Sequence, residues 1–433
     1  EVLRGPNALL FGRGGTGGVL NRVTKKAQLD QGFTTSQLSV DSLGELGGQI
    51  DHNRVISDSV ALRINAMVER LGNHRDFYDG DRVGVNPTLH IESGDSVIDL
   101  SYEYIDHQRF IDRGIPTGAD GRPVKAFEKI VFGDPDVNTT ALKAHLWRAS
   151  VQHSFSDTLK GNIAAFYGDY DKPYQNFYAA AYDQAQTPDE VTLDGYVDTT
   201  QRQNSILSAN LVGESEFAGM QHTLLAGVEF IDTSSDQDRW NSFWDTTDDD
   251  KETFSLTRNL GLEGGVGLNA LGNVATNSFD RDINDDTDVS IDVTSVYLQD
   301  ELTLTDYLQV VVGLRYDSFD IKVFNALADE TRSRKDSEVS PRFGVVYKPI
   351  DAISIYASYS ESFLPRSGEQ FANINGSNDE LAPNTFGNRE VGVKYDFASG
   401  LSFTAALFEI EQRSPQVADN DPATLDVIES EID

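Results

Sequence analysis

Residues 307–318, YLQVVVGLRYDS, alternate between two kinds of side chain. Leu308, Val310, Val312, Leu314 and Tyr316 share one parity, whereas Gln309, Arg315 and Asp317 share the other. A period of two residues is the signature of a β-strand with one apolar face. The same pattern recurs at 59–69, 96–104 and 388–397, each time with full charges on the polar face. The sequence therefore predicts an all-β chain whose strands have one apolar and one charged face.

Two architectures give such strands: a soluble sandwich with its apolar faces together, and a membrane barrel with its apolar face toward lipid. The connections separate them. Short turns are expected at 57–58, 94–95, 157–158, 306–307 and 351–352, and long loops at about 109–139, 172–199, 236–287 and 364–385. Short turns at one rim and long loops at the other are typical of an outer-membrane barrel. We therefore predict a transmembrane antiparallel β-barrel with about 15 or 16 strands present, out of about 22 in a complete plugged barrel.

Composition excludes several functions. The chain has 35 basic and 70 acidic residues and a net charge of -35, which argues against nucleic-acid binding, since phosphates need a basic surface. It has no cysteine, so neither a disulfide nor a thiolate metal site is possible. No run of about 18 apolar residues is present, which excludes a transmembrane helix.

The first 26 residues, EVLRGPNALLFGRGGTGGVLNRVTKK, differ from the rest because glycines crowd them. GRGGTG at 12–17 fits the G-x-G-x-x-G pattern of dinucleotide-binding enzymes, and Asp30 lies near the expected ribose-binding position. That pattern needs a βαβ unit around it, whereas strands and turns follow here. A glycine-rich turn where backbone passes close to backbone is the favoured interpretation. No Ser-His-Asp order or carboxylate pair indicates catalysis, so we do not expect an enzyme.

Several motifs in order resemble those of TonB-dependent outer-membrane receptors. EVLRGP at 1–6, GGVLN at 17–21 and VTKK at 23–26 resemble the last part of that family's plug domain; YLQDE at 297–301, GLRYD at 313–317 and NREVGVKY at 388–395 resemble its barrel strands. DRGIP at 112–116 and GDPD at 133–136 resemble the siderophore receptors, in particular the catecholate-type branch. The resemblance implies that 1–31 is the C-terminal part of a plug domain and 32–433 a barrel that is incomplete at its C-terminus.

The same resemblance implies a function. Such receptors lie in the outer membrane of Gram-negative bacteria among lipid and lipopolysaccharide, as monomers, and take up a ferric siderophore when the TonB-ExbB-ExbD complex acts on the plug. The segment that meets TonB would precede Glu1, and no cofactor is expected beyond the transported chelate. A receptor for cobalamin or a sugar, and a passive barrel channel, remain the alternatives.

Aromatic and cationic side chains in the expected long loops suit an anionic, aromatic iron chelate. The candidate ligand residues are Tyr174, Phe177, Tyr178, Tyr182, Trp240, Phe243, Trp244, Arg109, Arg113 and Arg366. By analogy with the family's contact between plug and wall, we expect Arg4 to pair with Glu390, with Glu361 or Glu301 nearby. The alternative is that these are solvated charges inside the barrel.

One acidic stretch resembles part of a calcium loop. Asp280, Asp282, Asn284, Asp286 and Asp288 alternate as such ligands do, but the turn glycine and the final bidentate glutamate are missing. A solvated acidic loop at 280–288 is favoured, and calcium binding there stays open.

Overall fold

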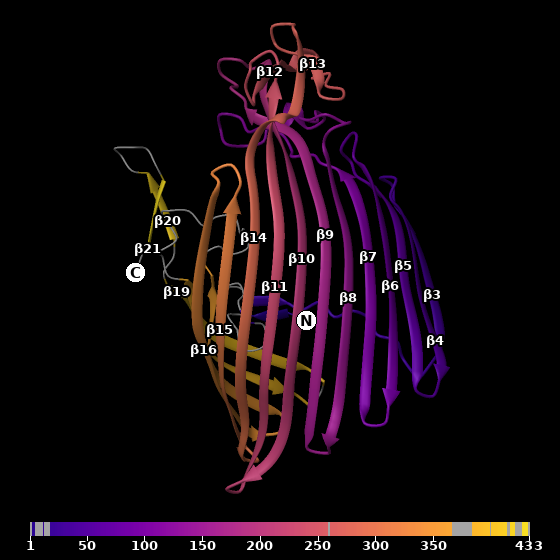
Figure 1. Cartoon of the computed structure of the whole chain (residues 1–433), viewed down its shortest axis with the longest axis vertical. Coiled ribbons are helices and arrows are strands. Elements are labelled where there is room, and N and C mark those ends of the chain that lie inside the picture. The colour runs from indigo at the N-terminus through magenta and orange to yellow at the C-terminus, as the bar shows by residue number, and fades with distance from the viewer. Residues whose placement is uncertain are drawn as a thin grey trace.

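The computed structural model describes residues 2–4, 12, 18–258, 260–365, 383–398, 400–413, 416–420 and 427–431. Fifteen long strands make one antiparallel barrel (Figure 1). They are β3 (Phe33–Val40), β4 (Leu46–Ser57), β5 (Val60–Gly72), β6 (Asp79–Ser93), β7 (Ser96–Phe110), β8 (Thr139–Ser156), β9 (Leu159–Ala181), β10 (Glu190–Phe217), β11 (Met220–Trp244), β14 (Val274–Thr305), β15 (Leu308–Asn325), β16 (Glu330–Ile350), β17 (Ile353–Leu364), β18 (Asn384–Asp396) and β19 (Ser402–Arg413).

Short elements complete the described structure. Strands β12 (Glu252–Ser255) and β13 (Val266–Leu268) and the 3-10 helices η1 (Lys125–Phe127) and η2 (Leu256–Arg258) lie in the connections, while β20 (Gln416–Asn420) pairs with β21 (Val427–Glu431). No helix in the described ranges is long and apolar enough to cross a membrane.

Tight turns gather at one rim of the wall, the lower one in Figure 1. All five expected short turns are confirmed, as two-residue connections at 58–59, 94–95, 157–158, 306–307 and 351–352, and a sixth lies at 218–219. Each of these turns joins two strands that pair antiparallel with each other. Larger connections, including β12 and β13, lie at the opposite rim.

Two of the expected long loops have the wrong bounds, because the connections are only 182–189 within 172–199 and 245–273 within 236–287. Most of 172–199 is strand, because β9 continues to Ala181 and β10 begins at Glu190; within 236–287, β11 continues to Trp244 and β14 begins at Val274. About 10 residues suffice to cross a membrane, so these strands of 23 to 32 residues extend well beyond it. The loop expected at 109–139 is confirmed between β7 and β8, and most of 364–385 lies outside the described residues.

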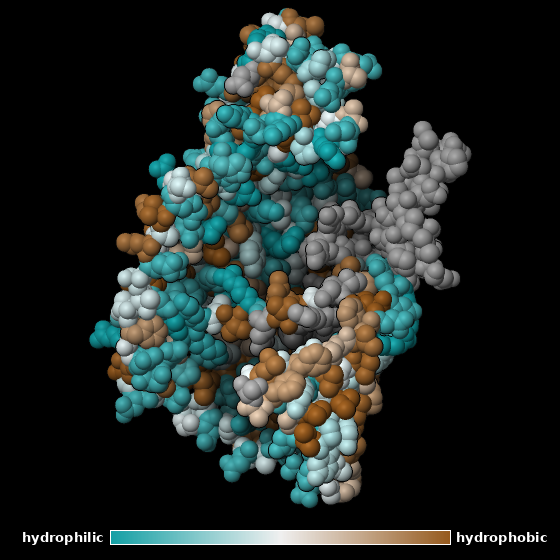
Figure 2. Space-filling view, turned by 180° about the vertical axis from the view of Figure 1, so that it is seen from behind, coloured by the Kyte–Doolittle hydropathy of each residue, from teal (hydrophilic) through white to brown (hydrophobic). Residues whose placement is uncertain are grey.

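Strand β15 shows that the wall has its apolar face outside. Leu314 has 52% of its surface exposed, whereas its neighbour Arg315 is 1% exposed. Asp317, on the same face as Arg315, is equally buried. Figure 2 shows hydrophobic residues gathered low on the side of the wall that the C-terminal strands form. This inverted arrangement confirms the membrane barrel.

The polarity of β15 reverses farther along the strand. Phe319, Ile321 and Val323 continue the inward face of Arg315 but are apolar and buried, while Asp320 and Lys322 point outward. The inward three pack against Val289, Ile291 and Val293 of β14. The outer surface therefore turns from apolar to polar just after Tyr316, where the strand leaves the hydrocarbon layer.

The described residues of the glycine-rich opening, 2–4, 12 and 18–20, do not have the pairing of a βαβ unit. Strands β1 (Val2–Arg4) and β2 (Gly18–Leu20) pair antiparallel, whereas a βαβ unit requires parallel strands. Between them, Gly12 has φ of +65°, and a Cβ there would lie 2.8 Å from Nη2 of Arg315. The backbone thus passes close to the wall in a left-handed conformation that glycine favours.

Candidate functional site

Strands β9, β10 and β11 extend above the hydrocarbon layer and carry different chemistry on their two faces. Phe177 and Tyr178 are neighbours in β9, so their side chains point to opposite faces of the sheet. The outer face is covered by two connections, 111–138 and 245–273, which we call the cap. The inner face looks toward the barrel mouth.

The outer face and the cap enclose a hydrophobic core. Phe177, Leu193, Trp244 and Phe254 are all 0% exposed there. The ring of Trp244 lies 5.3 Å from that of Phe177 and 5.2 Å from that of Phe254. Phe177 and Trp244, both predicted ligand residues, therefore have no surface left for a ligand. Tyr182 likewise packs at this core.

The inner face brings together tyrosines and arginines from three strands. Tyr174 stacks on Tyr196 at 5.9 Å between ring centroids, and Tyr178 meets Tyr196 edge-on at 6.1 Å. The Arg239 guanidinium lies 4.5 Å from the Tyr196 ring centroid and pairs with Asp198 through bonds of 2.6 and 2.7 Å. Tyr196 and Arg239 were missed from the sequence.

Arg113 reaches this cluster from the cap. Its guanidinium lies 4.5 Å from the centroid of the Tyr178 ring and donates to the Tyr196 hydroxyl at 2.6 Å. A weaker bond of 3.3 Å goes to the amide oxygen of Asn176. Arg113 is exposed, and among the described residues it forms no ion pair. We call Arg113, Tyr174, Tyr178, Tyr196 and Arg239 the tyrosine-arginine cluster.

The electrostatics of this cluster favour an anion. Lys251 pairs with Asp194 and Asp250, and Arg239 pairs with Asp198, so Arg113 is the one of these three cations that forms no ion pair among the described residues. Burial, with the nearby Asp194 carboxylate, raises the pKa of Tyr178 above its usual range. The Tyr178 hydroxyl therefore stays protonated near neutral pH and donates to Asp194 at 3.1 Å.

Arg239 remains charged within this cluster. The hydrogen bonds that Arg239 donates to Asp198 raise the pKa of Arg239, so its guanidinium keeps its proton. Arg109 contributes its positive charge beside Tyr174, whose pKa burial raises. Planar aromatic faces with guanidinium groups above them can bind a flat anionic group by stacking and by paired hydrogen bonds.

The other predicted ligand residues lie elsewhere. Trp240 pairs with Val197 in the ladder, while Tyr196 pairs with Asn241, so Trp240 points away from the cluster. Phe243 lies under Arg281, 5.4 Å from its guanidinium carbon. Arg366 falls outside the described residues.

The acidic stretch 280–288 is strand, not loop, because it belongs to β14. Its alternation is that of one strand face, interrupted by irregular pairing with β11. In the parts of the chain that the structure describes, no group of three or more His, Cys, Asp or Glu side chains could hold a metal ion.

The expected contact between Arg4 and the wall stays a prediction, because the Arg4 side chain lies outside the described residues. Glu390 pairs with Ser358 in the ladder and accepts a hydrogen bond from Tyr356. Glu361 lies three residues from Ser358 and thus on the opposite face, where Tyr359 donates to it. Glu390 and Glu361 therefore cannot both bind one partner inside the barrel. Glu301 lies on the face of β14 that points into the barrel.

The described tail of the opening segment contacts the wall through three other cations. Arg22 pairs with Glu103 at 3.4 Å, Lys25 with Asp51 at 2.8 Å and Lys26 with Asp99 at 2.7 Å. Each carboxylate also holds a cation or histidine of the wall: Arg148, Arg63 and His90 respectively. These contacts fix the tail against β4 to β8.

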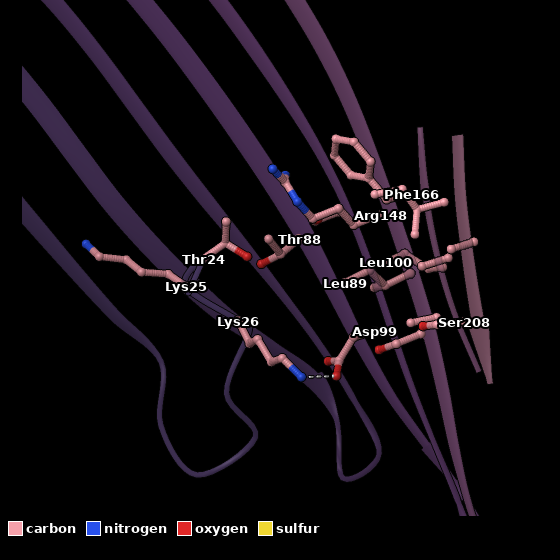
Figure 3. Close-up of a pocket in the computed structure, with 16 residues that line it drawn as sticks. Thr24, Lys25, Lys26, Thr88, Leu89, Asp99, Leu100, Arg148, Phe166 and Ser208 are labelled. Carbon is pink, nitrogen blue, oxygen red and sulfur yellow. Dashed lines mark hydrogen bonds and ion pairs between the residues drawn. The ribbon is translucent and has the colours of Figure 1, made fainter. Parts of the chain in front are cut away.

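A cavity of about 320 Å³ lies between this tail and the wall. Figure 3 shows Lys26 reaching Asp99 at its edge, with Arg148 and Phe166 on the wall strands. Unlike the tyrosine-arginine cluster, this cavity has its carboxylate and cations already paired. It is therefore a contact zone within the protein and a weaker candidate for ligand binding.

Comparison with known proteins identifies the family. Residues 84–429 match the family model described as TonB dependent receptor-like, beta-barrel. The chain belongs to the TonB-dependent receptor family. It is accordingly an outer-membrane protein, and the short-turn rim of this TonB-dependent receptor faces the periplasm, with the cap outside the cell.

Relatives of this TonB-dependent receptor include the metal-pseudopaline receptor CntO of Pseudomonas aeruginosa, 24% identical over 97% of the chain and 57% of that protein. The probable TonB-dependent siderophore receptor PiuA of Acinetobacter baumannii is 24% identical over 100% of the chain and 61% of its own length. The crystal structure of PiuA superposes with a TM-score of 0.81 at 21% identity, covering 98% of this chain and 63% of that one. The ferric-catecholate import receptor Fiu of E. coli gives 0.77 at 19% identity, over 99% and 64%. The chain thus spans about three fifths of the relatives it matches.

Proposed function

We propose that this protein is an outer-membrane receptor and energy-coupled transporter of a ferric siderophore, gated by TonB acting on a plug. The observation that carries the proposal is the tyrosine-arginine cluster at the outer mouth of the barrel. There Arg113 presents an exposed guanidinium whose hydrogen bonds within the described part of the chain go to neutral oxygens, the Tyr196 hydroxyl and the Asn176 amide. The names of relatives such as PiuA and Fiu point the same way.

The chemistry of the cluster favours a catecholate chelate over a neutral one. A ferric catecholate is a flat, aromatic anion, so its rings can stack on Tyr174 and Tyr178 while its charge faces Arg113. Arg239 is largely neutralised by Asp198 and holds Tyr196 in place. The chelate is cargo, so neither catalysis nor a resident cofactor is part of the proposal. TonB, ExbB and ExbD are its proposed partners in the whole protein.

Equilibrium binding to the purified protein tests this function. A ferric catecholate, a ferric hydroxamate, cobalamin and a neutral sugar would each be titrated while tryptophan fluorescence is followed. We expect the ferric catecholate to bind best, and Arg113→Ala to weaken it about tenfold, the loss of one charged hydrogen bond. Preferred binding of cobalamin or the sugar would overturn the siderophore assignment. Unchanged affinity in Arg113→Ala would remove the cluster from the site.

A further inference from the structure

The loop 111–138 carries Arg113, and its conformation around that residue is held by one carboxylate. Asp112 accepts a hydrogen bond from the backbone N–H of Gly114 at 2.8 Å through Oδ1. Its Oδ2 receives an ion pair from Nε of Arg75, in the connection between β5 and β6. Gly114 has φ of +88°, a left-handed conformation that glycine favours. The carboxylate thus fixes the backbone on both sides of Arg113.

Arg75 also fastens a distant part of the same loop. Its Nη1 donates to the carbonyl of Glu128, and its Nη2 donates to the carbonyl of Ile130 at 2.8 Å. The side chains of Arg75 and Asp112 are only 14% and 9% exposed. Because the pair is largely desolvated, removing one partner leaves the other charge buried, which is costly. One guanidinium therefore joins the start and the middle of the loop.

The far end of the loop is fastened independently. Asp134 is 0% exposed, and its Oδ2 accepts from the N–H of Gly265 at 2.7 Å, which ties the two cap connections together. Asn138 exchanges two hydrogen bonds of 2.9 Å with the backbone of Phe177, the residue before Tyr178. The loop thus meets β9 at Phe177, next to the Tyr178 ring that Arg113 covers.

We propose that Arg75 is a positioning residue for ligand binding: through Asp112 it holds Arg113 over Tyr178, so that the loop 111–138 is a preorganised wall of the site. The inference rests on the proposed function of the tyrosine-arginine cluster. Preorganisation raises affinity because the cost of ordering the loop is met on folding and not on binding. It also gives DRGIP and GDPD their physical role, since Asp112 and Asp134 are the acids that fasten the two parts of the loop.

A double-mutant cycle tests this inference. The affinity of a ferric catecholate is measured for Arg75→Ala, Arg113→Ala and the double variant. We expect Arg75→Ala to weaken binding about tenfold when Arg113 is present and to have no further effect when it is absent, because its influence passes through Arg113. Arg122→Ala is the matched control: it removes an exposed arginine from the same loop, and unchanged affinity is expected.

The outcomes separate the two proposals. If Arg113→Ala leaves the affinity unchanged, the proposed function of the cluster fails. If Arg113→Ala weakens binding but Arg75→Ala has no effect, or has the same effect in both backgrounds, the positioning inference is overturned and the function stands. Should Arg75→Ala not reach the folded barrel, judged by heat-modifiable migration on gels, Asp112→Asn replaces it in the cycle. Asparagine keeps an oxygen for Gly114 but loses the charge that binds Arg75, so the same two patterns decide.

Discussion

Phe177→Ala should reduce the stability of the cap, whereas Tyr178→Ala should reduce the affinity for the ligand, although the two residues are adjacent. The Phe177 ring is completely buried and lies 5.3 Å from the ring of Trp244 and 5.2 Å from that of Phe279. Truncating such a side chain costs about 3–5 kcal/mol, from lost burial and the cavity left behind. We expect Phe177→Ala to loosen the cap while the wall below stays folded.

Tyr178→Ala instead removes a half-buried ring from the inner face. It loses the contact with the Arg113 guanidinium at 4.5 Å and the hydrogen bond to Asp194 at 3.1 Å. Contacts of this kind are worth about 1–2 kcal/mol, so the affinity for a ferric catecholate should fall about tenfold while the stability of the cap changes little.

Two measurements separate these effects. Trp244 lies in the cap core, so in a background that carries Trp147→Phe and Trp240→Phe the thermal transition of the tryptophan fluorescence reports on the cap, and titration with the chelate reports on the site. Phe177→Leu is the control for Phe177→Ala, because it keeps most of the apolar volume and should retain both stability and affinity. The assignment of the two faces is refuted if Tyr178→Ala unfolds the cap, or if Phe177→Leu weakens binding as much as Tyr178→Ala does.

Three further outcomes are expected from the wall and the tail. Burial and neighbouring aspartates raise the pKa of Asp238, so its negative charge destabilises the folded state at neutral pH. Asp238→Asn should therefore raise the melting temperature at pH 7. This gain should shrink as the pH falls through the raised pKa of the folded state and vanish below about pH 3.8, the ordinary pKa of the group. Leu314→Arg should cost about 2–4 kcal/mol in unfolding from lipid vesicles, since Leu314 faces the hydrocarbon, whereas Asp320→Arg, above the apolar band, should be near neutral. Asn53→Ala should lower the free energy of unfolding by about 1–3 kcal/mol, because the buried Asn53 amide accepts from the N–H of Gln28 and donates to its carbonyl. Equal protease sensitivity of the tail in the variant and the parent protein would contradict this prediction.

The barrel could be predicted from the sequence because two independent signals agree in it. The alternation in 307–318 fixes which residues share a face, and the two-residue turns fix which strands are neighbours. Neither signal requires knowledge of distant contacts. The inward position of Arg315 and the outward position of Leu314 followed from them directly.

The ligand site was predicted only in part, because loops were expected where strands continue. In a loop, Phe177, Tyr178 and Trp244 are equally available aromatic residues; in a strand, parity decides between them. Asp194, Tyr196 and Asp198 alternate in the sequence, a pattern that could have indicated one face of a strand. Arg239 joins them only through the pairing of β10 with β11, which no local pattern reveals.

The reversal of polarity along β15 explains why the sequence pattern did not predict the outer ends of the strands. A search for an apolar outward face follows Val310, Val312, Leu314 and Tyr316 and then loses the strand at Ser318, where water replaces lipid outside. The backbone does not change there: the ladder with β14 continues unbroken to Asn325. Only the surroundings of the two faces change, so beyond this point the apolar residues are the ones that point inward. In a barrel that extends beyond its membrane, hydropathy therefore marks the edge of the hydrocarbon layer, and the end of a strand must be sought in the turn residues instead.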